Sequence, residues 1–164
     1  MQKLSWREKY AGILVLLIGI FFLIMQVASL LSNTSHPYAI QNGALVIDKN
    51  EFFSDVRTYS IILAGIVAGW LLLKSNRIGW VLGLPLLLFA MAIISLTTVE
   101  GIIKTKKINN NALIGPGVSV LLLLLAIIFL FLPSARQKYR VSKGVVLLTL
   151  VLFVALGCAY MYLQ

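Results

Sequence analysis

The sequence has few charged residues for its length and almost no cysteine or histidine. Of its 164 residues, 12% are charged and 60% are hydrophobic, with one cysteine and one histidine. Soluble domains carry about a quarter charged residues, so a soluble chain of this composition lacks the polar side chains needed to cover its apolar ones. Lipid is the solvent that removes this difficulty. The composition therefore predicts an integral membrane protein.

The scarcity of cysteine and histidine limits the disulfides, metal sites and acid–base catalysis that the chain can support. A lone Cys158 excludes a disulfide within the chain and a Cys-x-x-Cys metal or redox site. His36 with Asp48, Glu51 and Asp55 is a weak metal signal because their spacing defines no geometry, and solvated loop residues explain them equally well. One histidine also leaves little scope for acid–base catalysis at neutral pH. We therefore predict no catalytic residue, no metal site and no cofactor.

Acidic residues are also scarce. Five acidic residues stand against 14 basic ones, for a net charge of +9. The basic residues lie in short segments between apolar runs, where they act as topology signals facing anionic lipid. No basic stripe interleaves with aromatic residues as in a nucleic-acid-binding module. We expect the lipid bilayer as a partner, and not nucleic acid.

What the chain has in abundance is long apolar runs. Five of them predict membrane-spanning helices at residues 11–31, 57–73, 78–99, 113–132 and 144–163. Residues 57–73 form the weakest run, since Gly65 and Gly69 add little apolar surface. The first run follows a basic stretch, as in a signal peptide. It is longer than the roughly 7 to 15 apolar residues of such peptides, so an uncleaved helix is favoured over cleavage near residues 27–29.

The connecting segments complete an all-α prediction. Residues 1–164 form one membrane domain of five helices in an antiparallel bundle, with a tight hairpin between the second and third spans because only residues 74–77 separate them. Residues 32–56 form an outer loop. Asn42-Gly43 is a turn signal there, and Ala44 to Ile47 can form a short strand. Residues 133–143 form an inner basic loop.

The distribution of basic residues orients the chain. With five spans, nine of the 14 basic residues fall on the side of the N-terminus, which marks it as cytoplasmic. These nine are Lys3, Arg7, Lys9, Lys74, Arg77, Arg136, Lys138, Arg140 and Lys143. We expect an inner-membrane protein of bacterial type, with an extracytoplasmic C-terminus. The alternative is four spans, with the second run lying on the membrane surface and the C-terminus inside.

Small residues mark the expected helix contacts. Gly65 and Gly69 form one GxxxG motif, and Gly79 and Gly83 form another. Bare backbone lets helices approach closely, and packing drives helix association in lipid. Contact within the chain is one interpretation, and a dimer face is the other.

Polar residues inside the apolar runs are few. The possible interior polar groups are Gln26, Ser95, Ser119 and Thr149. A hydroxyl can bond its own helix backbone, whereas the amide of Gln26 cannot fully satisfy itself and should face another helix or the interface.

Three functional classes remain open. The first is a non-enzymatic accessory, assembly or interaction protein, which binds another membrane protein or a second copy of itself. The second is a small transporter or channel acting as an oligomer, with the four interior polar groups lining its path. The absence of charge from the central part of each run counts against ion coupling. The third is a lipid-modifying enzyme that uses Glu100, His36 or Asp48. The uncharged runs favour the first class.

The predicted number of spans is testable with a reporter fused after Gln164. Five spans and a cytoplasmic N-terminus place this reporter outside the cytoplasm. Paired alkaline phosphatase and fluorescent protein fusions measure its location, with a fusion in the 133–143 loop as the cytoplasmic control. A cytosolic reporter at Gln164 contradicts the odd number of spans.

Overall fold

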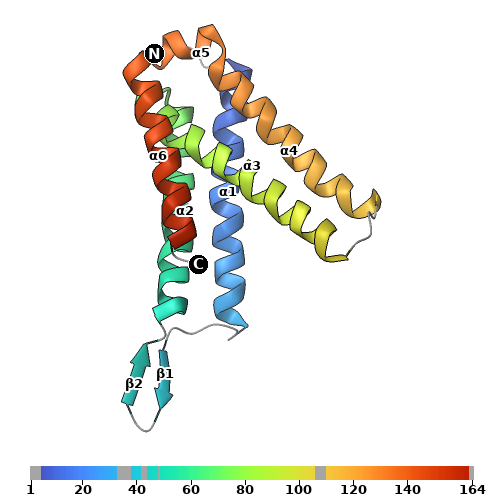
Figure 1. Ribbon diagram of the computed structural model, residues 1–164. Helices are drawn as coiled ribbons and strands as arrows, with labels where there is room; N and C mark the ends of the chain where they lie inside the picture. Colours follow the sequence, from blue (N-terminus) through green and yellow to red (C-terminus); the bar gives the residue numbers. More distant parts are fainter. Residues whose placement is uncertain (1–4, 33–37, 42–43, 48, 106–109, 163–164) are drawn as a thin grey trace.

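A computed structural model describes residues 5–32, 38–41, 44–47, 49–105 and 110–162 (Figure 1). Within these residues, six helices and a two-stranded hairpin form the fold. In chain order they are α1 (Trp6–Leu31), β1 (Tyr38–Gln41), β2 (Ala44–Ile47), α2 (Lys49–Leu73), α3 (Arg77–Thr105), α4 (Asn110–Phe131), α5 (Pro133–Lys138) and α6 (Lys143–Tyr162).

In the part of the chain that the structure describes, four helices are long and apolar enough to cross a membrane. Their candidate spans are Trp6–Leu31, Asp55–Leu73, Arg77–Lys104 and Leu113–Phe131, and the apolar helix Lys143–Cys158 is shorter. The prediction of a helical protein with several membrane-spanning helices is therefore confirmed. The fifth span, in α6, stays a prediction.

The elements extend beyond the predicted spans. Helix α2 begins at Lys49 inside the predicted outer loop, α3 continues to Thr105, and the inner loop contains the short helix α5. Within the outer loop, β1 and β2 form an antiparallel pair of strands in which Tyr38 pairs with Ile47. Apolar length therefore marks the part of a helix that lipid can cover, whereas backbone hydrogen bonding continues into the polar flanks.

Helices α1 and α2 run side by side from the hairpin to the opposite end of the molecule (Figure 1). A Cβ atom placed on Gly65 would lie 2.8 Å from the Cα atom of Gly19, and one on Gly69 would lie 2.7 Å from the backbone nitrogen of Leu16. Glycine at these positions allows the two backbones to touch, which maximises dispersion contacts where no hydrophobic force acts between helices.

A tight turn joins α2 to α3. The Asn76 N–H donates to the carbonyl of Leu71 and the Ser75 N–H donates to that of Leu72, with Ser75 at φ 54°. This pairing is a Schellman motif, which satisfies the last carbonyls of α2. The Asn76 side chain then accepts from the Ile78 N–H and caps α3.

The second glycine motif lies beside this turn. Gly79 faces the backbone of Leu71 and Leu72, and a Cβ on Gly83 would lie 2.7 Å from the Leu72 side chain. The two motifs therefore contact different helices: Gly65 and Gly69 contact α1, whereas Gly79 and Gly83 contact the end of α2.

The most buried part of the core lies near the α2–α3 turn. Trp80 and Leu72 are fully buried there, and the indole N–H of Trp80 donates to the carbonyl of Leu130 at 3.1 Å. From this end, α3 and α4 slant away from α1 as a pair, while α6 returns toward the hairpin end (Figure 1). The helices are thus closely packed at one end and spread apart at the other.

The contact between α1 and α2 is testable by adding one methyl group. We expect Gly65→Ala to lower the free energy of unfolding by about 1 to 3 kcal/mol, because the methyl group meets the backbone of Gly19. Thermal unfolding followed by circular dichroism in detergent measures the change. Gly157→Ala is the matched control, since a Cβ there meets nothing within 4 Å. Its melting temperature should stay the same or rise, and an equal loss in both variants contradicts the contact.

Candidate functional site

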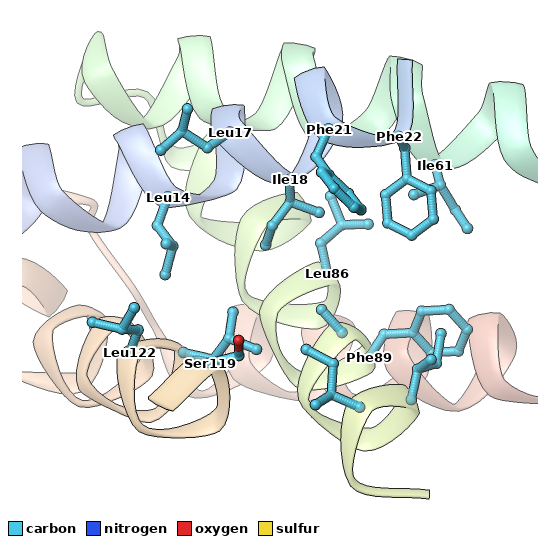
Figure 2. Close-up of a pocket in the computed structure, with 14 residues that line it drawn as sticks. Leu14, Leu17, Ile18, Phe21, Phe22, Ile61, Leu86, Phe89, Ser119 and Leu122 are labelled. Carbon is cyan, nitrogen blue, oxygen red and sulfur yellow. The ribbon is translucent and has the colours of Figure 1, made fainter. Parts of the chain in front are cut away.

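An apolar groove lies where α3 and α4 diverge from α1, with a volume of about 360 Å³. We call it the α1–α3–α4 groove. Its lining residues are Leu14, Leu17, Ile18, Phe21 and Phe22 of α1, Ile61 of α2, Leu86, Phe89, Ala90, Ile93 and Ile94 of α3, and Ser119, Leu122 and Leu123 of α4. Figure 2 shows the side chains of α1 facing Ser119 and Leu122 across the opening. Its volume lies in the range of ligand sites.

Aromatic contacts hold the closed end of this groove together. The Tyr10 hydroxyl donates to the Leu122 carbonyl at 3.1 Å, and the rings of Trp6 and Tyr10 pack edge-to-face on Phe129 with centroids 5.3 and 5.8 Å away. The guanidinium of Arg7 lies 6.0 Å from the Phe129 ring centroid. These contacts fasten α4 to the first turns of α1. The next turns of α1 line the groove, beyond the point where α4 has separated.

Among the described residues, Ser119 is the only polar one that lines the groove. Its hydroxyl donates to the carbonyl of Gly115 at 3.0 Å, so its hydrogen bond is made within α4. A Cβ on Gly115 would meet nothing within 4 Å. Gly115 and Ser119 are four residues apart and therefore share a face of α4. That face combines small side chains with open space beside them.

A buried ion pair closes the same end of the molecule. The Lys138 Nζ lies 2.7 Å from the Glu8 carboxylate, and their side chains are only 9% and 5% exposed. Glu8 also accepts from the Ser5 N–H at 3.0 Å, and the Ser5 hydroxyl accepts from the Glu8 N–H. The carboxylate thus caps α1 and binds α5 at once, which compensates for its loss of hydration.

Tyr139 extends this cluster to α2. Its hydroxyl donates to the Leu72 carbonyl at 3.0 Å, and the residue is 1% exposed. Burial, and then the negative charge of Glu8, raise the pKa of Tyr139 well above its usual value. The phenol therefore stays protonated and keeps donating. The N-terminus of α1, the end of α2 and α5 are joined through buried polar contacts.

The predicted interior polar residue Gln26 has a partner on α2. Its side-chain amide donates to Asp55 Oδ1 at 3.1 Å, and Gln26 is 9% exposed. The sequence indicated that this amide should face another helix or the interface, and it faces another helix. Asp55, which we had placed in the outer loop, is its acceptor because α2 begins earlier than the apolar run.

The other interior polar residues do not meet Gln26. The Thr149 hydroxyl donates to the Val145 carbonyl at 2.8 Å within α6 and is buried, whereas Ser95 is exposed on α3. Ser119 lines the groove, as described above. The four residues lie on four different helices, and the structure does not bring them together into one site.

Several predicted functional residues lie outside the described part of the chain. His36 and Asp48 are among them, and of Glu51 only the backbone is described. Glu100 pairs with Lys104 at 3.9 Å on the exposed surface, where such a pair contributes little to stability. No group of three or more His, Cys, Asp or Glu side chains that could hold a metal occurs in the described ranges.

Sequence reasoning missed Glu8 and the groove. The local signal for Glu8 was Ser5-x-x-Glu8, a capping-box pattern. Its partner Lys138 lies 130 residues away and carries no local signal. Apart from Ser119, the groove residues are ordinary apolar residues of four helices, and only the angle between the helices distinguishes them from other apolar residues.

Comparisons of the chain with protein-family models, with curated proteins and with solved structures found no match.

The buried ion pair is testable by a double-mutant cycle. We expect Glu8→Gln or Lys138→Met alone to lower the free energy of unfolding by about 3 to 5 kcal/mol, because each removes one partner of a buried ion pair. The double variant should lose less than the sum, and unfolding in a detergent titration measures all three.

The matched control is the exposed pair, changed to Glu100→Gln and Lys104→Met. Exposed pairs contribute about 0 to 1 kcal/mol, so these variants should unfold nearly as the unmodified protein does. Additive losses for Glu8 and Lys138 contradict a direct interaction.

Proposed function

We propose that the chain is a non-enzymatic accessory or interaction protein of the membrane, which receives an apolar transmembrane segment of a partner protein in its α1–α3–α4 groove. The observation that carries this proposal is the groove itself, a cavity of about 360 Å³ lined by apolar side chains of three spans together with Ile61 of α2. It opens beside the small-residue face of α4 at Gly115 and Ser119.

The small residues favour a helix as the occupant. Lipid tails are as apolar as leucine, so helices associate in a membrane only where they pack better with each other than with lipid. Bare backbone at Gly115 and a short, internally bonded side chain at Ser119 offer a close approach. Phe21 and Leu17 on the opposite wall are more than half exposed and can pack on the same helix.

The arrangement of polar groups supports transport less well. A polar path requires groups that converge and are available to a solute. Gln26 is bound to Asp55, and the hydroxyls of Ser119 and Thr149 are bound to their own helices. In these positions the polar groups stabilise the bundle and do not form a path for a solute. We therefore favour an interaction protein over a transporter.

We further propose five spans with a cytoplasmic N-terminus. The N-terminal turn of α1, the α2–α3 turn and α5 meet at one end through Glu8, Lys138 and Tyr139. This end holds the basic connectors, which favours the cytoplasmic face. The close packing of Gly65 on Gly19 supports α2 as a span rather than a surface helix. The return of α6 toward the hairpin end supports an odd number of crossings.

The proposal is tested by photocrosslinking followed by purification of the complex. A photoreactive amino acid at Leu17 or Leu122 in the groove should yield one discrete crosslinked membrane protein. Leu150, which is 50% exposed on α6, is the matched control and should crosslink lipid only. The protein so identified is then co-purified with the unmodified chain.

Variants of the α1–α3–α4 groove test whether it is the interface with the partner. We expect Gly115→Leu and Ser119→Leu to reduce recovery of the partner at least tenfold, because their side chains fill the space that a helix needs, while Gly157→Leu leaves it unchanged. Equal recovery with all three variants contradicts the groove as the interface. Solute flux into liposomes that is lost in Gln26→Leu would replace the interaction role with transport.

A further inference from the structure

A second groove lies on the other side of α3, between α2, α3 and α6, with a volume of about 350 Å³. We call it the α2–α3–α6 groove. Its apolar wall includes Ala64 of α2, Pro85 of α3, and Leu152 and Leu156 of α6. It contains one charged residue, Arg57 of α2.

The charge lies at one end of the groove, whereas apolar residues line the groove throughout, including Val56 beside Arg57. Arg57 and Ser60 line the part near the hairpin end, and Ala64 lies about two helical turns further along α2. Arg57 is also at the start of the candidate span Asp55–Leu73, which places it at the depth of lipid headgroups. The groove therefore presents a cation at headgroup level and an apolar surface below it.

The length of the groove along α2 is close to the hydrocarbon thickness of one leaflet. Residues 56 to 64 of α2 extend over about 12 Å at 1.5 Å per residue, and half of the hydrocarbon core is about 15 Å. A chain that enters at Arg57 reaches most of the way to the bilayer midplane alongside Pro85 and Leu152. An acyl chain has this length and chemistry.

We propose that the α2–α3–α6 groove binds one anionic phospholipid from the leaflet on the hairpin side, with its phosphate on Arg57 and one acyl chain along α2, α3 and α6. A guanidinium is suited to phosphate because it presents several N–H donors in a planar fork. The opposite charges of guanidinium and phosphate select an anionic headgroup, and the apolar wall selects a lipid over free phosphate. The lipid proposed here does not depend on a partner being bound in the α1–α3–α4 groove.

Native mass spectrometry of the full chain in detergent tests the site. Phosphatidylglycerol and phosphatidylcholine with identical acyl chains are titrated separately. We expect one phosphatidylglycerol to bind at least fivefold more tightly, and Arg57→Gln to remove this preference. Inorganic phosphate in excess should not displace the lipid.

Two further variants separate the headgroup from the chain. Arg77→Gln, the matched charge control at the opposite end of the bundle, should keep the preference. Ser60→Trp, on the exposed rim, should weaken both lipids by filling the groove entrance. The proposal is overturned if Arg57→Gln still prefers phosphatidylglycerol over phosphatidylcholine, or if Arg77→Gln loses this preference to the same extent. Displacement by inorganic phosphate overturns the lipid as the ligand.

Discussion

Helices α1 and α2 approach so closely that glycine backbone lies against glycine backbone at Gly19 and Gly65. In lipid this contact cannot arise from water leaving apolar surface, so it depends on the number of atoms that the two helices bring together. Among the described helices, α1 and α2 make the most extensive contact, α3 and α4 pack on this pair, and α6 packs on α3. The positions of both grooves follow from where those helices leave the pair.

Contacts at the end of the bundle that holds α5 set where the other helices separate from α1 and α2. A buried ion pair between Glu8 and Lys138 and a hydrogen bond from Tyr139 to Leu72 join three segments far apart in sequence. Trp80 adds a bond to the carbonyl of Leu130, which holds α3 against the end of α4. With one end fastened in this way and α3 and α4 slanting together, the opposite half of the bundle has open space on both sides of α3.

The two grooves share a wall. Ile61, Leu86 and Phe89 line both of them, so an occupant on one side of α3 touches residues that also face the other side. Their proposed occupants differ because the polar groups at the two openings differ. Ser119, whose hydroxyl is bonded within α4, is the polar residue of one groove, which suits a helix, whereas the guanidinium of Arg57 lines the other together with Ser60, which suits a phosphate. The same layer of apolar residues can thus support two kinds of binding.

Much of the fold was predictable from the sequence, because hydrocarbon requires long uncharged runs whose backbones bond internally. Those runs predicted the helices and the short α2–α3 connection, and the turn signal at Asn42-Gly43 indicated that Ala44 to Ile47 can form a short strand. Sequence alone also indicated that Gln26 needs a partner, since an amide cannot satisfy itself on a helix. The helix ends differed from the apolar boundaries at Lys49 and Thr105, because polar residues can continue a helix beyond the lipid.

The angles between helices and the long-range pairs were decided only in three dimensions. Nothing in the sequence links Glu8 with Lys138, Gln26 with Asp55, or Arg57 with Leu156, since each pair lies on separate helices. The apolar composition and length of a segment determine whether it enters the membrane, because each residue contributes separately to the free energy of transfer from water to lipid. A groove depends on the distance between segments, and that distance is set by the sum of many weak contacts along both helices.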